Sequence, residues 1–308
     1  MTLTTTEPAP TPSAIPPVLP DDDGGTDLTI ASLHLHPVKS CAGLAVAQAG
    51  VAATGLAGDR LWMLVDADGL FVSQREHPRM ACLRPQPGAD GGLVVVAPDG
   101  DRLDLPAGAG LAGERLRVRV WDDEVDAIAA GPQADAWFGA RLGEPVRLVR
   151  FAPGQRRLSS RRWTGPLEAE NAFSDGYPIL VASRASLDEL NRRLAAAGQA
   201  PVTMDRFRPN LVIDGPGPHG EDALDELVFP TPDGPVRLRL VKPCPRCPMP
   251  NIDPATGLAG REPGDTLAAY RADPRVGGAI TFGMNAVIVE GVGRRLVAGM
   301  RGRGTVRF

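Results

Sequence analysis

The chain has 308 residues, 43% of them apolar, which is enough to build two cores of ordinary domain size. Its net charge is −4, with both signs mixed along the chain, so it lacks the basic stripe that nucleic-acid binding needs. No apolar run approaches the roughly 20 residues of a membrane-spanning helix, and the first residues do not follow the signal-peptide pattern. The sequence therefore predicts a cytoplasmic protein with no nucleic-acid or membrane partner.

The predicted fold is mainly β with a few helices, of the α+β class, because Gly (36) and Pro (31) are abundant and aromatic residues make up only 5%. Residues 1–27, rich in Thr and Pro, are expected to form a disordered tail. Residues 28–150 read as a first β domain. It contains a hairpin that turns at Asp68-Gly69 and a strand at 115–120 in which apolar residues alternate with arginines.

A helix over 132–143, with proline in its first turn and glycine after its last, is expected to close this domain. Residues 151–308 read as a second β domain that opens with a polar, arginine-rich connecting loop at 151–171. A capping box that begins at Ser186 predicts a helix ending near Gly198. Strands at 206–215, 236–244 and 279–292 and a short helix capped by Asp265 complete the expected elements.

The two lysines of the chain mark the first candidates for function. Of 33 basic residues only Lys39 and Lys242 are lysine, a skew typical of a bacterium with GC-rich codons, and each precedes a cysteine by two residues. A compact ammonium holds a phosphate as a point charge. The four cysteines lie in a chain too large to need disulfide staples, so we expect reduced thiols.

The sharpest motif is the proline-flanked pair Cys244/Cys247, followed by Asp253-Pro254-Ala255-Thr256-Gly257. Prolines stiffen a loop, so it loses little entropy when it binds a metal, and Arg246 next to Cys247 favours a thiolate. Three other interpretations stay open here. They are half of a zinc site that needs two more ligands, a thioredoxin-like redox pair that would open a helix, and a buried structural pair.

Three further groups are candidates for a ligand site, although each also fits the bracing of a turn. Lys39 and Ser40 end an expected strand, where ammonium, hydroxyl and turn amides together suit a phosphate. In the segment 173–178 (FSDGYP), polar side chains are grouped within a stretch of otherwise apolar, strand-like sequence. Arg208 and Asn210 are two apart on an expected strand, so both point to one face and can hold one ligand.

The sequence resembles the MOSC-domain proteins that carry an N-terminal MOSC β-barrel domain. The resemblance rests on motifs that occur in the same order: PVKSC, DR, FSD, FRPN, and CxRC followed by DPxTG. That group contains the mitochondrial amidoxime-reducing component and its bacterial relatives, and the resemblance runs from about residue 28 to the C-terminus. It implies an N-terminal β-barrel-like domain followed by a MOSC β-barrel domain. The chain departs from the family at 248–251 (PMPN), where relatives show an apolar residue and threonines.

The resemblance also implies a site. The second cysteine of CxRC ligates molybdenum in the family, which assigns the catalytic metal ligand to Cys247 and leaves Cys244 as a structural thiol. The implied cofactor is molybdenum-molybdopterin. The residues that would hold its pterin and phosphate, or line the same pocket, are Lys39, Ser40, Arg60, Tyr177, Arg208, Asn210, Pro245, Arg246 and Asn285.

The activity implied is the two-electron reduction of small N-hydroxylated substrates such as amidoximes, with release of water. Because no cysteine cluster remains for an iron–sulfur centre, the electrons are expected from a separate reductase, either a flavoprotein, a ferredoxin or a b-type cytochrome. The superfamily is also described as binding pyridoxal phosphate. Two alternatives are a carrier of sulfur or of the molybdenum cofactor, using a persulfide on Cys247, and a zinc-stabilised interaction module.

Overall fold

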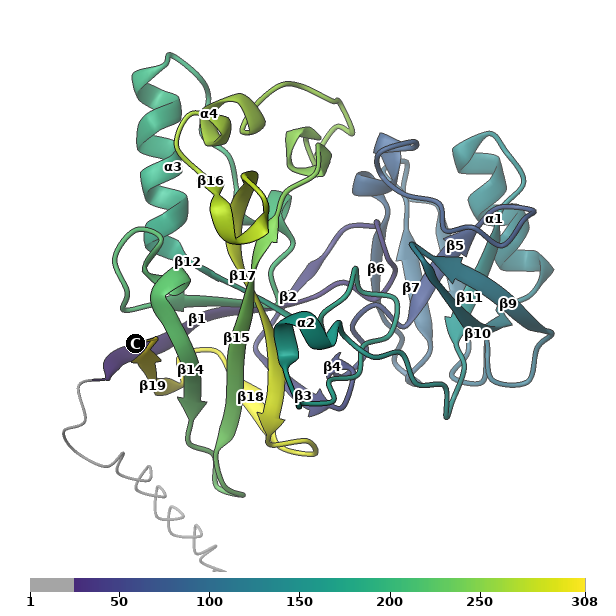
Figure 1. Ribbon diagram of the computed structural model, residues 1–308. Coiled ribbons are helices and arrows are strands. Elements are labelled where there is room, and N and C mark those ends of the chain that lie inside the picture. Colours follow the sequence, from purple (N-terminus) through teal and green to yellow (C-terminus); the bar gives the residue numbers. More distant parts are fainter. Residues whose placement is uncertain (1–24, 308) are drawn as a thin grey trace, which may run out of the picture.

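The computed structural model describes residues 25–307, which form two β bodies lying side by side (Figure 1). The larger body is a closed barrel of seven strands in the order β12-β13-β1-β19-β14-β15-β17, and pairing of β12 with β17 closes the ring. These strands are β1 (Thr26–Leu35), β12 (Ile179–Ser183), β13 (Leu211–Asp214), β14 (Leu224–Phe229), β15 (Val236–Pro245), β17 (Ala279–Glu290) and β19 (Arg301–Val306).

Short strands extend the barrel at its margins. β2 pairs with β1, β16 pairs with β17, and β18, β3 and β4 form a small sheet of their own. Their bounds are β2 (Leu44–Val46), β3 (Gln48–Ala52), β4 (Gly55–Leu56), β16 (Ala272–Asp273) and β18 (Arg295–Val297). Strands β1, β3 and β4 thus pack in one core with strands that follow residue 179.

This packing corrects two expectations. β1 begins at Thr26, inside the predicted tail 1–27, because its alternating apolar residues pair with β13 and β19; residues 1–24 lie outside the described residues. The predicted boundary at residue 150 also does not separate the two cores. β1 to β4 come from the first half of the chain but belong to the barrel, since β1 fills the gap between two later strands.

The smaller body consists of two sheets, β5-β11-β10-β9 and β6-β7-β8, with helix α1 packed against β11 and β8. Its strands are β5 (Trp62–Val65), β6 (Arg84–Pro87), β7 (Leu93–Val96), β8 (Arg102–Leu105), β9 (Arg115–Val120), β10 (Asp123–Ala129) and β11 (Arg147–Phe151). The predicted hairpin is confirmed, since the Asp66 amide donates to the Leu70 carbonyl at 2.9 Å. In β9, Val118 and Val120 are buried while the arginines face outward.

Helices decorate the margins of both bodies in the described part of the chain. The α-helices are α1 (Pro132–Leu142), α2 (Arg161–Thr164), α3 (Arg184–Ala196) and α4 (Gly264–Ala268). The 3-10 helices are η1 (Pro78–Cys82), η2 (Met204–Phe207), η3 (Gly220–Ala223), η4 (Met249–Asn251) and η5 (Pro274–Val276). The fold class expected from the sequence, mainly β with a few helices, is confirmed. No helix among these has the length and apolar composition that crossing a bilayer requires.

Helices α1 and α3 were predicted correctly, but two predicted caps were wrong. The N-cap of α3 is Ser183, whose hydroxyl accepts from the Ser186 amide at 3.1 Å. The Ser186 hydroxyl instead donates to the buried carboxylate of Glu221, a partner 35 residues away that a local pattern cannot reveal. Asp265 lies inside the first turn of α4, which Pro263 precedes.

The polar, arginine-rich connection predicted at 151–171 is buried at one of its arginines. Arg157 is only 5% exposed. Its guanidinium donates to the Asn171 side chain and to the carbonyls of Ala172 and Ser174. Phe173, held between these bonds, packs edge-on against Phe151 with ring centroids 5.2 Å apart. A buried arginine therefore ties this connection to the smaller body.

Replacing Arg157 with alanine should lower the free energy of unfolding by about 3 kcal/mol, because it leaves several buried acceptors without a donor. Urea denaturation measures this loss. The matched control is Arg156→Ala, whose side chain is 54% exposed and pairs with Glu170 at the surface, so its loss should cost about 0.5 kcal/mol. Equal losses for the two variants would contradict the bracing role of Arg157.

Candidate functional site: a cationic cleft between the two bodies

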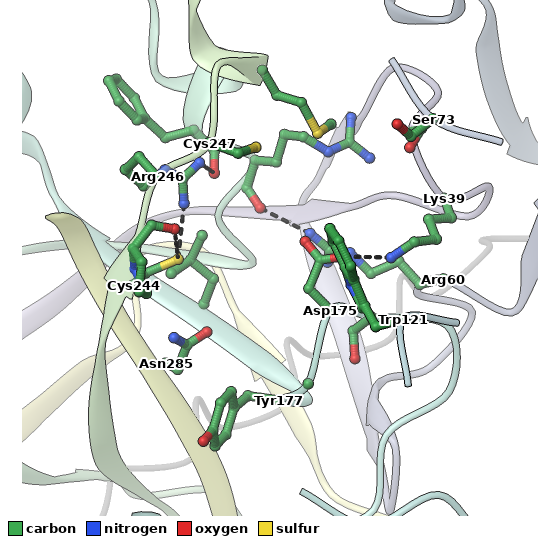
Figure 2. Close-up of a pocket in the computed structure, with 18 of the residues that line it drawn as sticks. Lys39, Arg60, Ser73, Trp121, Asp175, Tyr177, Cys244, Arg246, Cys247 and Asn285 are labelled. Atoms are coloured by element: carbon green, nitrogen blue, oxygen red, sulfur yellow. Dashed lines mark hydrogen bonds and ion pairs between the residues drawn. The ribbon is translucent and has the colours of Figure 1, made fainter. Parts of the chain in front are cut away.

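The cleft between the two bodies holds about 1030 Å³ of space, counting the part open to solvent. Both bodies contribute to its wall. Figure 2 shows the two cysteines of the CxRC motif on one side and Lys39, Ser73 and Trp121 on the other. All ten residues predicted for the site line this one cleft: Lys39, Ser40, Arg60, Tyr177, Arg208, Asn210, Pro245, Arg246, Cys247 and Asn285.

Lys39 lies where the chain passes from the barrel into the smaller body. Leu35 packs in the barrel core and Val38 in the core of the smaller body. The Lys39 side chain is 7% exposed, and its ammonium donates to the Phe173 carbonyl at 2.9 Å and to the Asp175 carboxylate (Figure 2). Burial lowers the pKa of Lys39, and the neighbouring Asp175 carboxylate opposes that shift. Ser40 follows in the left-handed conformation, with φ 66°.

Arg60 and Asn210 link the bodies a second time. Arg60 donates to the Asp59 carboxylate, to the Asn210 side-chain oxygen at 3.1 Å and to the Arg208 carbonyl at 3.0 Å. The Asn210 side-chain oxygen also accepts from the Leu180 amide at 3.1 Å. Each guanidinium and amide here has a fixed partner, so the polar groups facing the cleft are held in place.

Arg208 lies before strand β13 in the left-handed conformation, with φ 57°. The expectation that Arg208 and Asn210 are alternate residues of one strand was wrong, although both line the cleft. Arg208 donates to the Cys41 carbonyl. Burial, together with the neighbouring Arg60, lowers the pKa of Arg208 to about 10, so it stays charged at neutral pH.

The CxRC motif leaves β15 and runs along the cleft. Cys247 is exposed and its thiol is free. The Arg246 guanidinium donates to the Cys244 sulfur at 3.0 Å and to the Phe207 carbonyl at 2.7 Å (Figure 2). Arg246, expected to act on the neighbouring Cys247, thus makes its hydrogen bond to the other cysteine of the motif. Because the extended strand alternates its side chains, the arginine reaches back to the cysteine two residues before it.

These positions bear on the other interpretations of the cysteine pair. Neither Cys244 nor Cys247 is buried, which contradicts a buried structural pair. The motif is followed by the three-residue turn η4 rather than by an α-helix, unlike a thioredoxin-like pair. Within residues 25–307, no three His, Cys, Asp or Glu side chains gather to hold a metal ion, so the zinc interpretation has no ligand set there.

The charge of the cleft favours an anion. Its wall carries the single carboxylate Asp175 and six cationic side chains: Lys39, Arg60, Arg75, Arg208, Lys242 and Arg246. Charges of one sign in a recess raise the local concentration of the opposite ion. The Tyr177 hydroxyl, also in the wall, is buried without a hydrogen-bond partner among the described residues, and burial raises its pKa to about 12.

The sequence marked Lys242 and the segment that contains Asp175 as candidates but did not assign these two residues to the site, and Trp121 was not predicted at all. Trp121 sits at the turn between β9 and β10 in the left-handed conformation, φ 56°, and is 41% exposed. Its indole N–H donates to Asp175 at 3.2 Å. A large aromatic residue in a polar hairpin turn was the available signal, because such a position offers it no local core.

Comparison with known proteins agrees with this architecture. Residues 27–145 match the MOSC N-terminal beta barrel domain, and residues 168–299 match the MOSC domain. The chain is 36% identical to mitochondrial amidoxime-reducing component 1 of Mus musculus over 80% of this chain and 72% of that one. It is 34% identical to mitochondrial amidoxime reducing component 2 of Homo sapiens over 80% of this chain and 73% of that one.

The chain therefore belongs to the family of MOSC-domain proteins that carry an N-terminal MOSC beta barrel, together with these amidoxime-reducing components. A more distant relative is the molybdenum cofactor sulfurase of Oryza sativa subsp. japonica. It is 30% identical over 84% of this chain but over only 32% of its own length. The resemblance inferred from the ordered motifs is thereby confirmed.

Exposure predicts which thiols react first. Cys244 and Cys247 reach the cleft, whereas Cys41 and Cys82 are buried, and burial raises the pKa of Cys41 to about 12. Iodoacetamide should therefore label the CxRC cysteines in the native protein and the other two only after unfolding. Peptide mass spectrometry measures the order. Labelling of Cys41 as fast as Cys247 would contradict the described cleft.

Proposed function

We propose that this protein is a molybdenum-cofactor-dependent oxidoreductase that reduces small N-hydroxylated compounds, with the Cys247 thiolate as the protein ligand to molybdenum. The observation that carries the proposal is that the exposed thiol of Cys247 lies in the same cleft as six cationic side chains. That combination suits a ligand with a thiophilic metal at one end and a phosphate at the other.

The residues present fit molybdenum-molybdopterin. A thiolate suits a metal already bound by dithiolene sulfurs. Lys39, Ser40 and Arg60 would hold the phosphate from the smaller body, and Arg208 and Asn210 would hold the pterin from the barrel side. The remaining wall positions for the pterin are Tyr177, Pro245, Arg246 and Asn285.

When bound, the cofactor supplies the two electrons that convert an N–OH group to N–H with uptake of two protons and release of water. The chain's own groups position the reactants and supply the field. Arg60 and Arg208 are held by the protein before any ligand arrives, so they need no reorganisation when an anion binds. The open cleft admits water as the source of protons.

A separate reductase would supply the electrons. Of the four cysteines, Cys41 and Cys82 are buried apart from the CxRC pair, so the chain has no cysteine set for an iron–sulfur cluster. The partner would be a flavoprotein, a ferredoxin or a b-type cytochrome. The cytoplasmic location, the bacterial source, the absence of a nucleic-acid partner and the pyridoxal phosphate of the superfamily description stay predictions.

A second candidate function is a carrier of sulfur or of the cofactor, with a persulfide on Cys247. The observation that favours it is the similarity to a protein named molybdenum cofactor sulfurase. The oxidoreductase is preferred because Lys39 and Arg60 add a second, fixed cationic wall to the cleft, which suits a permanent site better than one that releases its ligand.

The decisive experiment is expression in a host that makes the molybdenum cofactor, followed by elemental analysis and by assay of benzamidoxime reduction with an artificial electron donor. Bound molybdenum together with turnover supports the proposal. Molybdenum without reduction of any N-hydroxylated compound, or sulfur carried on Cys247, would favour the carrier. Zinc in place of molybdenum would reject both.

Within this proposal the two cysteines of the motif should behave differently. Cys247→Ala removes the metal ligand and should lose most of the molybdenum, whereas Cys244→Ala should keep most of it, because the Cys244 sulfur is already engaged by Arg246. Inductively coupled plasma mass spectrometry of the two purified variants measures the metal. Equal losses of molybdenum in the two variants would contradict the assignment of Cys247 as the metal ligand.

A further inference from the structure

Arg75 lies in the wall of the cleft against two aromatic rings. Its guanidinium carbon is 4.5 Å from the centroid of Trp121 and 5.6 Å from that of Phe71, and the two ring centroids are 4.9 Å apart. Trp121 is in turn fixed by its hydrogen bond to Asp175. An aromatic wall of this kind attracts the guanidinium without using its N–H donors.

Those donors have no hydrogen bond to any other described residue. The one ion pair of Arg75 joins its Nε to Glu76 Oε1 at 3.7 Å, beyond hydrogen-bond distance, and Glu76 itself accepts from the Ser73 hydroxyl. The Arg75 side chain is 26% exposed. The guanidinium is thus partly buried, its plane lies against the two rings, and its N–H donors are unused. Such a group is suited to a planar oxyanion, which it binds through two parallel hydrogen bonds.

Arg75 differs in this respect from the cations predicted to hold the cofactor. Lys39, Arg60, Arg208 and Arg246 each donate to a protein carbonyl or side chain. Their positions are therefore set by the protein, whereas the partner that Arg75 is shaped to take is not part of the described chain. The remaining cleft cation, Lys242, lies over the rings of Trp163 and Tyr177, at 5.5 Å and 5.7 Å.

The charges around Arg75 indicate on which side of the aromatic wall an anion would bind to it. Arg75 and Trp121 also border a depression on the other side of the aromatic wall, which is lined by five carboxylates: Asp66, Glu76, Asp122, Glu124 and Glu144. An anion is repelled from these carboxylates and attracted by the six cations of the cleft. The unused donors of Arg75 therefore serve a ligand in the cleft.

We propose that Arg75, supported by Trp121 and Phe71, is a binding site for a carboxylate of the substrate, so that the protein prefers N-hydroxylated compounds that carry a carboxylate. This inference rests on the proposed function and names the substrate class for the same cleft. The planar fork of a guanidinium matches a carboxylate. The phosphate of the cofactor would instead bind the cations that hydrogen bonds to the protein already hold in place.

The test compares benzamidoxime with 4-carboxybenzamidoxime on the molybdenum-loaded protein. Wild type should have the higher kcat/KM for the carboxylated compound. Arg75→Gln should lower the ratio of the two kcat/KM values roughly 10- to 100-fold, mainly through KM, because a charge-assisted bidentate contact is lost. Arg75→Lys keeps the charge without the fork and should give an intermediate ratio. The matched control is Arg79→Gln, which removes an exposed arginine outside the cleft wall and should leave the ratio unchanged.

Isothermal titration calorimetry with the product analogue 4-carboxybenzamidine gives a readout that does not need turnover, and its affinity should fall by the same factor in Arg75→Gln. An unchanged ratio and an unchanged affinity would overturn the inference. Loss of molybdenum from Arg75→Gln would also overturn it, by assigning Arg75 to the cofactor. If wild type reduces neither amidoxime, the proposed function fails, and the calorimetric comparison still decides whether Arg75 binds the carboxylate.

Discussion

The buried ammonium of Lys39 is the interaction on which the cleft depends. A buried charge must be paired and hydrogen-bonded, and both partners of Lys39 come from the segment 173–175, more than a hundred residues away in sequence. That segment is anchored in the smaller body by the Phe173 ring. Lys39, where the chain leaves the barrel, is thereby joined to residues 173–175, which precede its return. Both segments line the cleft between the two bodies.

Around this joint the protein has arranged its charges in two groups. Most cations of the cleft are fixed by protein acceptors, which prepares them for an anion at no cost in reorganisation when the ligand arrives. Arg75 is fixed instead by the aromatic faces of Phe71 and Trp121, which leaves its donors available. The same recess can therefore hold one anionic ligand permanently and still select another.

The CxRC loop carries Cys247, the proposed ligand of the metal. Prolines lie on both sides of Cys244 and directly after Cys247, which limits the conformations the loop can adopt. Met249, which follows the motif, also lies in the cleft wall, so an apolar side chain borders the cleft close to Cys247 in sequence.

The sequence by itself determined most of the local elements and ten of the residues that line the cleft. Hairpin, helix and strand patterns such as Asp68-Gly69 and 132–143 depend on neighbours a few residues apart, and the ordered motifs identified ten residues that share one cleft. Only the tertiary structure decided which side chains meet. The insertion of β1 between β13 and β19 and the pairing of Ser186 with Glu221 bring together segments that are far apart in the chain, as does the position of Trp121 over Arg75. Such contacts carry no periodic trace in the sequence, because they arise only when strands far apart along the chain are brought side by side.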